Sequence, residues 1–243
     1  MITLGKQSEV RLKPKIVCLG YDCCMRTILT KLKYKPSKQD GELSMPFDLT
    51  IHPYTSVCEY LKTDFTDYFK DITWKTHYCD IRKKEVKNMI NGKGVFFVHE
   101  SHLQNQEQTP EFESDAWSAK KSDVDFHYNN KVFLKQRYFQ RMANFYDVVG
   151  NSSEVIFVLS THIDIDVTII NNIIKERFPK LSFKIYCLRV YNTGEKVQLF
   201  QKFVLNNMIV NCCKLPADGF WNTNDENRNA VEDVLRDDLR LFV

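Results

Sequence analysis

The chain has 243 residues, of which 43% are hydrophobic and 27% charged, and its formal net charge is +3. This charge is too small to imply nucleic-acid binding, and the basic residues alternate with acidic ones instead of forming a stripe. No segment reaches the roughly 18 uninterrupted apolar residues of a membrane span, and the N-terminus lacks the features of a secretory signal. We therefore expect one cytoplasmic domain over residues 1–243.

Short apolar segments alternate along the chain with segments whose apolar residues have helical spacing. Strands that alternate with helices favour parallel pairing and a layered arrangement. We expect a single three-layer α/β domain with a mostly parallel central sheet of about four to five strands. Insertions are expected at about residues 34–90, with several short helical pieces, and at about 101–130. The predicted strands are 15–19, 94–98, 154–160 and 182–190, with a candidate fifth at 207–212, and the predicted helices are 23–33, 132–149, 167–178 and 225–241.

The chain contains eight cysteines, spread along its length without any Cys-x-x-Cys spacing. In a large chain without an export signal, this distribution predicts reduced thiols and not a disulfide framework. The adjacent pairs Cys23-Cys24 and Cys212-Cys213 also lack the spacer through which two thiolates chelate one zinc ion. We expect neither a metal nor another cofactor.

The run from Ile16 to Met25 is an apolar strand that breaks at Gly20 and places Cys23 where a helix is expected to begin. Unpaired backbone N–H groups and the positive end of the helix dipole stabilise a thiolate at such a position. Cys23 is thus the leading candidate for a nucleophile. The alternative is that Cys23 is one more buried, small hydrophobic residue.

Candidate partners for Cys23 follow the predicted strands, at the edge of the sheet where open α/β folds bind ligands. His99 follows the second predicted strand, and His162 and Asp164 follow the third. A thiol nucleophile needs a histidine that keeps it ionised and a carboxylate or amide that orients the imidazole. We expect His99 to be this histidine, with His162 and Asp164 as alternates. A purely structural, hydrogen-bonded role is the other interpretation of each histidine.

The cluster of His162, Asp164 and Asp166 has a second interpretation, because these side chains could together bind a divalent metal ion. The more economical interpretation is that Asp164 or Asp166 caps the following helix.

Five further residues are candidates for binding a ligand. Tyr21 and Asp22 directly follow the first predicted strand. Arg137 and Arg141 are one helical turn apart, which suits a phosphate or carboxylate group but also a solvated face or a structural ion pair. Trp221, in a late polar turn, is placed at the same edge of the sheet by topology alone.

Three motifs in the first part of the chain occur together in a known family. They are Leu19-Gly20-Tyr21-Asp22-Cys23, Pro46-Phe47-Asp48-Leu49 and Phe97-Val98-His99-Glu100. The combination resembles a family of papain-like cysteine peptidases of unknown function, with motifs Leu-Gly-x-Asn-Cys, Pro-Phe-Asp-Trp and Phe-x-His. Residues 137–142 and the strand at 155–158 are similar to that family's arginine-bearing helix and third strand. The resemblance covers roughly two thirds of the chain.

The resemblance implies that Cys23 is the nucleophile and that His99 and Asp48 are its partners. Asp22 stands where the family has asparagine and Leu49 where it has tryptophan, so the substrate contacts stay open. The signature of true papains is absent. Asp48 is also suited to cap the next helix.

The sequence therefore predicts a cysteine hydrolase that acts on an amide, ester or thioester of a peptide or small acyl substrate. It needs no cofactor, specific nucleic acid or membrane span. One alternative is a transferase or ligand-binding domain that holds a phosphate-bearing molecule, such as a nucleotide or coenzyme A. Another alternative is a non-catalytic interaction protein of the same fold.

Overall fold

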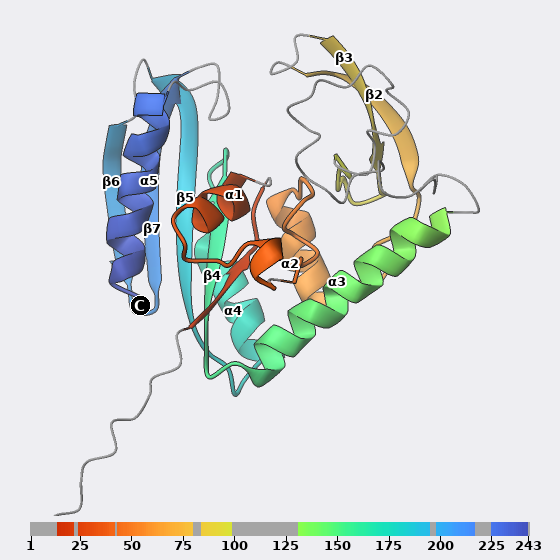
Figure 1. Cartoon of the computed structure of the whole chain (residues 1–243), viewed down its shortest axis with the longest axis horizontal. Coiled ribbons are helices and arrows are strands. Elements are labelled where there is room, and N and C mark those ends of the chain that lie inside the picture. The colour runs from red at the N-terminus through yellow and green to blue at the C-terminus, as the bar shows by residue number, and fades with distance from the viewer. Residues whose placement is uncertain are drawn as a thin grey trace, which may run out of the picture.

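The computed structural model of the protein describes residues 14–21, 24–41, 43–79, 84–98, 131–194, 198–216 and 225–242. At its centre lies a five-stranded sheet with strand order β1-β4-β5-β7-β6 (Figure 1). β1, β4, β5 and β7 run parallel, and β6 pairs antiparallel with β7. This confirms the expected α/β fold with a mostly parallel sheet. The strands are β1 (Lys15–Cys18), β4 (Glu154–Thr161), β5 (Ser182–Gly194), β6 (Gln198–Leu205) and β7 (Met208–Pro216).

The two faces of the sheet are covered by different helices. Successive residues of a strand point to opposite faces, so Val17 and Phe157 join one core while Ile16 and Val158 join the other. The first core is closed by α2, α3 and α4, and the second by α1 and α5. Burial on both faces explains why the central strands are nearly continuous apolar runs. The helices are α1 (Cys24–Lys31), α2 (Tyr54–Thr63), α3 (Val132–Asn151), α4 (Val167–Arg177) and α5 (Asp225–Arg240), with a short 3-10 turn at Lys38–Asp40.

The strand predicted at residues 94–98 is wrong. Phe96 makes only isolated antiparallel bridges, to Ile51 and Ile90, and the segment does not join the central sheet. Its neighbours Val95 and Phe97 are fully buried against the helical layer, where the ring of Phe97 packs on that of Tyr138. The segment has the alternating burial of a strand, but its backbone bonds to Ile51 and Met89, outside the central sheet.

The sequence also missed three strands. The insertion at 34–90 contains α2 but also an antiparallel hairpin of β2 (Thr73–Cys79) and β3 (Lys84–Ile90), which stands apart from the main sheet (Figure 1). The edge strand β6 is exposed along its whole length. Polar residues interrupt all three strands, so they lack the continuous apolar run by which buried strands are predicted. The expected insertion at 101–130 lies outside the described residues.

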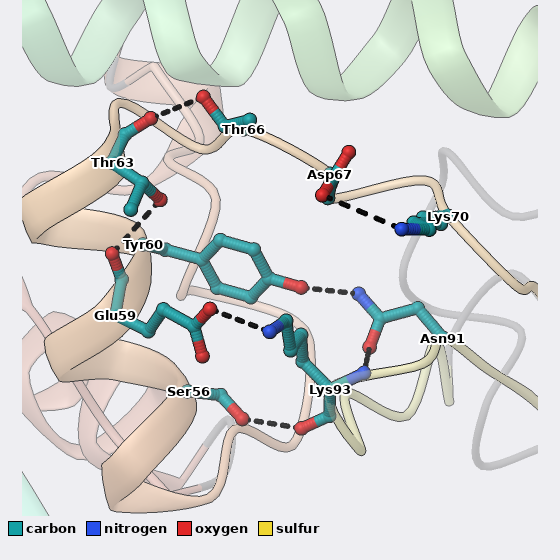
Figure 2. Close-up of polar contacts among 9 residues, drawn as sticks. All are labelled: Ser56, Glu59, Tyr60, Thr63, Thr66, Asp67, Lys70, Asn91 and Lys93. Atoms are coloured by element: carbon teal, nitrogen blue, oxygen red, sulfur yellow. Dashed lines mark hydrogen bonds and ion pairs between the residues drawn. The ribbon is translucent and has the colours of Figure 1, made fainter.

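A set of polar contacts joins α2 to the turn that follows β3 (Figure 2). The Asn91 side chain is buried and makes four hydrogen bonds: Nδ2 donates to the Tyr60 hydroxyl at 2.9 Å and to the Tyr68 carbonyl at 2.6 Å. Its Oδ1 accepts from the backbone N–H groups of Lys93 and Val95, both at 3.0 Å. Asn91 therefore satisfies its full hydrogen-bonding capacity inside the protein.

We expect Asn91→Ala to lower the free energy of unfolding by about 2–4 kcal/mol, because it leaves buried donors and an acceptor without partners. Urea titration followed by circular dichroism measures this loss. The matched control is Lys93→Ala, which removes only an exposed 2.5 Å ion pair with Glu59 and keeps the backbone contacts. That control should cost much less, because exposed ion pairs contribute little to stability. Equal losses in the two variants would contradict the assignment.

Candidate active site at the carboxyl end of the sheet

The carboxyl ends of β1 and β4 bring Tyr21 and His162 together. Their rings meet edge to face with centroids 4.8 Å apart, and the Tyr21 N–H donates to the Ser160 carbonyl at 3.2 Å. Tyr21 is exposed and His162 is half-buried. An aromatic ring and an imidazole, one from each strand, therefore occupy this edge of the sheet.

Asp164 makes contacts to β5. The Tyr191 hydroxyl donates to Asp164 Oδ1 at 2.5 Å, and Arg189 Nη1 lies 3.7 Å from the same oxygen. This hydrogen bond to the carboxylate raises the pKa of Tyr191. Arg189 also donates to the Ile165 carbonyl, so the loop after β4 is fastened to β5.

Asp166 caps α4, as one of the two interpretations of this cluster predicts. Its Oδ1 accepts from the Thr168 N–H at 2.9 Å and from the Thr168 hydroxyl at 2.6 Å, and these bonds lower the pKa of Asp166. Within the part of the chain that the structure describes, no group of three His, Cys, Asp or Glu side chains is placed to hold a metal ion. His162, Asp164 and Asp166 are all described, so they do not form the metal cluster considered as an alternative.

Asp48 is a buried carboxylate between two cations. Its Oδ2 accepts from the Met45 N–H at 2.8 Å and lies 3.7 Å from Arg26 Nε, while Oδ1 lies 3.9 Å from Lys35 Nζ. Arg26 belongs to the first turn of α1, which begins at Cys24, the residue after Cys23 in the sequence. Asp48 thus links its own turn to α1 and to the segment that follows α1.

Asp48 does not cap the next helix, which was the alternative interpretation. α2 begins at Tyr54 after Pro53, and the carboxylate of Asp48 accepts a hydrogen bond from Met45, which precedes it in the chain.

Lys35 is only 1% exposed and also donates from Nζ to the Ile16 carbonyl at 3.2 Å. A buried lysine of this kind requires a nearby carboxylate, which Asp48 supplies.

His52 is a buried histidine that no sequence motif singles out. Its Nδ1 lies 2.9 Å from Thr50 Oγ1, and its Nε2 lies 3.1 Å from the Tyr68 hydroxyl. Thr50 donates its own proton to the Pro46 carbonyl, so Thr50 accepts from Nδ1–H and Nε2 accepts from Tyr68. Burial lowers the pKa of His52 to about 3, which keeps the imidazole neutral.

His52 also fixes this turn to the end of β1, because its backbone N–H donates to the Tyr21 carbonyl at 3.0 Å. Thr50 precedes it by two residues, but Tyr68 comes from the turn after α2. No local pattern in the sequence could reveal that second partner, so the role of this histidine could not be predicted.

Four of the predicted site residues, Asp22, Cys23, His99 and Trp221, lie outside the described residues. The topological reason for placing His99 at the edge of the sheet fails, because residues 94–98 do not form a strand of that sheet. The pairing of Cys23 with His99 stays a prediction that rests on the family resemblance.

The two arginines of α3 are placed differently. Arg141 is only 4% exposed, and its guanidinium carbon lies 4.4 Å from the centroid of the Tyr138 ring. This is a cation–π contact within the helical layer and not a solvated face. Arg137 is half-buried one turn earlier on the same helix.

Five cysteines with described side chains are all free thiols and all buried. Desolvation raises the pKa of Cys187 and of Cys213 to about 12, and it also raises the pKa of Cys58 and Cys212. Thiols in such surroundings remain protonated and react slowly. These five residues are Cys18, Cys58, Cys187, Cys212 and Cys213.

The described part of the chain defines a three-layer α/β protein that gathers Tyr21, His162 and Asp164 near one edge of its parallel sheet. Among its described helices, none combines the length and the apolar content that a bilayer crossing requires. Comparisons with protein-family models, with curated proteins and with solved structures find no match.

Proposed function

We propose that this protein is a cysteine hydrolase in which Cys23 attacks the carbonyl carbon of an amide, ester or thioester. The observation that carries the proposal is that α1 begins at Cys24, directly after Cys23 in the sequence, and that a buried ion pair anchors its first turn. The start of a helix stabilises a thiolate through its N–H groups and its dipole. The same donors suit the oxyanion of a tetrahedral intermediate.

A histidine is needed to take the proton of the thiol and return it to the leaving group. The family resemblance assigns this role to His99, and the sheet edge offers His162 and Asp164 as the alternates. The resemblance also makes Asp48 a member of the relay. The contacts of Asp48 with Arg26 and Lys35 support a different role, in which it positions α1 and so acts through that helix.

The test is labelling of the folded protein with a small iodoacetamide probe at about pH 6, where an ordinary thiol is almost wholly protonated. We expect Cys23→Ala to reduce incorporation at least about tenfold, because the buried cysteines are protonated and shielded. Cys24→Ala is the matched control and should be labelled like the wild type. Mass mapping of the labelled peptide identifies the residue. Unchanged labelling of a folded Cys23→Ala variant would refute the proposal.

The partner histidine is found by repeating the labelling across a range of pH with His99→Ala and with His162→Ala. The true partner is the residue whose removal raises the apparent pKa of the thiol.

A thermal shift screen distinguishes the hydrolase from the transferase or ligand-binding alternative. Nucleotides or coenzyme A should raise the melting temperature of the protein only if they bind its native state.

A further inference from the structure

A pocket of about 780 Å³ lies at the amino end of β1, whereas Tyr21 and His162 meet beyond the carboxyl end of that strand. Its walls come from the start of β1, from the last turn of α1 with the residues that follow it, and from the last turn of α3. This volume is typical of pockets that hold a small molecule. The proposed hydrolase activity assigns this pocket no role.

The walls of the pocket are largely apolar. Ile16 and Met45, which line it, are buried, and Tyr34 and Val148 are half-buried. Leu43 also lines the pocket, yet it is 54% exposed to water. Contact of this surface with the apolar part of a ligand is favourable, because it removes apolar area from water.

Four lysines line the same pocket, and two of them have no partner among the described residues. Lys31 and Lys35 are each paired with a buried carboxylate of the chain. Lys15 and Lys33 are exposed, and their ammonium groups make neither an ion pair nor a hydrogen bond within the described part of the chain. Two positive charges at the pocket are therefore available to an anion.

Two aspartates also line the pocket, but each accepts hydrogen bonds from a residue close to it in the sequence. Asp40 Oδ2 accepts from the hydroxyl and the N–H of Ser37, at 2.6 and 3.3 Å, and these bonds lower the pKa of Asp40. Asp147 Oδ1 accepts from Asn151 Nδ2 at 2.7 Å. In the described chain, neither aspartate forms an ion pair with the two available lysines, so their charges are not compensated there.

Lys33 has a backbone conformation that favours glycine. Its φ is +60°, in a turn where the N–H groups of Tyr34 and Lys35 both donate to the Leu29 carbonyl, at 3.0 and 3.1 Å. Helices that end in this way usually have glycine here, because a side chain is disfavoured at positive φ. Residues held in such conformations cluster at ligand-binding sites. Lys33 also lines an adjoining pocket of about 340 Å³ that extends to α5.

We propose that the larger pocket binds a small amphipathic anion, whose apolar chain lies against the apolar walls and whose carboxylate or phosphate head group lies beside Lys15 and Lys33. Lysine ammonium groups bind anionic head groups as point charges. The carbonyls of Leu29 and Thr30 at the end of α1 accept from N–H groups of the following turn, which limits their repulsion of an anion. The proposal does not depend on Cys23.

Isothermal titration calorimetry of the full chain with decanoate and with decyl phosphate tests the proposal. We expect at least one of these anions to bind, and Lys33→Gly and Lys15→Gln each to raise its dissociation constant at least about threefold, because each removes a charge beside the head group. Leu43→Ser should also weaken binding, because an apolar contact is lost. Lys180→Gly, which removes an exposed lysine from the turn after α4, is the matched control and should bind like the wild type.

Misfolding does not explain a loss of binding in Lys33→Gly, because glycine is favoured at positive φ and urea titration should show this variant to be at least as stable as the wild type. Decanol, which lacks the charge, should bind at least about tenfold more weakly than the better anion. The proposal is overturned if neither anion binds at millimolar concentration, if decanol binds as tightly, or if both lysine variants bind like the wild type. Labelling of Cys23 is a separate measurement, so the hydrolase proposal and this one can fail independently.

Discussion

Asp48→Asn lowers the free energy of unfolding by about 3–5 kcal/mol, because it removes the negative charge from a buried ion cluster while it keeps the size of the side chain. Lys35 loses the carboxylate that lies 3.9 Å from its Nζ, and at 1% exposure it cannot be solvated by water instead. Arg26 loses its partner in the first turn of α1. Urea titration of the wild type and the variant measures the difference.

The matched control for this prediction is Asp67→Asn. Asp67 forms a 3.8 Å ion pair with Lys70, but both side chains are more than half exposed. Surface pairs of this kind contribute less than about 1 kcal/mol. A loss for Asp48→Asn as small as that for Asp67→Asn would show that the buried cluster does not stabilise the fold.

Asp48→Asn also separates two roles of the carboxylate. Adding Lys35→Met to Asp48→Asn should partly compensate for the lost stability, because the double variant no longer buries a lysine without its carboxylate. A folded Asp48→Asn variant whose Cys23 still reacts at mildly acidic pH supports positioning. Loss of that reactivity at full stability supports the relay that the family resemblance implies.

His52 makes the stability of the protein fall as the pH decreases below about 6.5. Burial holds the pKa of His52 at about 3 in the folded state, whereas an unfolded histidine titrates near 6.5. Between these values the unfolded chain binds the extra proton, so the free energy of unfolding rises with pH across this window. We expect a loss of about 2–3 kcal/mol between pH 7 and about 4.5 from this residue.

The measurement is a series of urea titrations at successive pH values. His52→Asn should be less stable at neutral pH, because the contacts with Thr50 and Tyr68 are lost, and it should lose this component of the slope. His162→Asn should retain the slope, since His52 is untouched. Parallel pH profiles of His52→Asn and the wild type would disprove the assignment.

The elements that the sequence predicted well are those whose burial is visible in a local pattern. The apolar runs that became β4 and β5 are buried on both faces, and α3 and α4 have apolar residues at helical spacing. Asp166 was identified, with Asp164, as a possible cap because it directly precedes a predicted helix, and its partner Thr168 is only two residues away. Residues 94–98 were misread because Val95 and Phe97 have the alternating burial of a sheet strand, whereas the segment makes only isolated bridges, to Ile51 and Ile90.

By itself, the sequence determined the α/β class, the main helices and central strands, and the position of Cys23 just before a helix. Each of these features depends on side chains that are close together in the sequence, within one helical turn or one strand. Only the tertiary structure decided that Asp48 joins Arg26 and that Lys202 joins Asp238, because each pair spans many residues of chain. A buried charge must be paired, and its partner can come from a distant part of the chain. The local periodicity of the sequence does not indicate which residue that partner is.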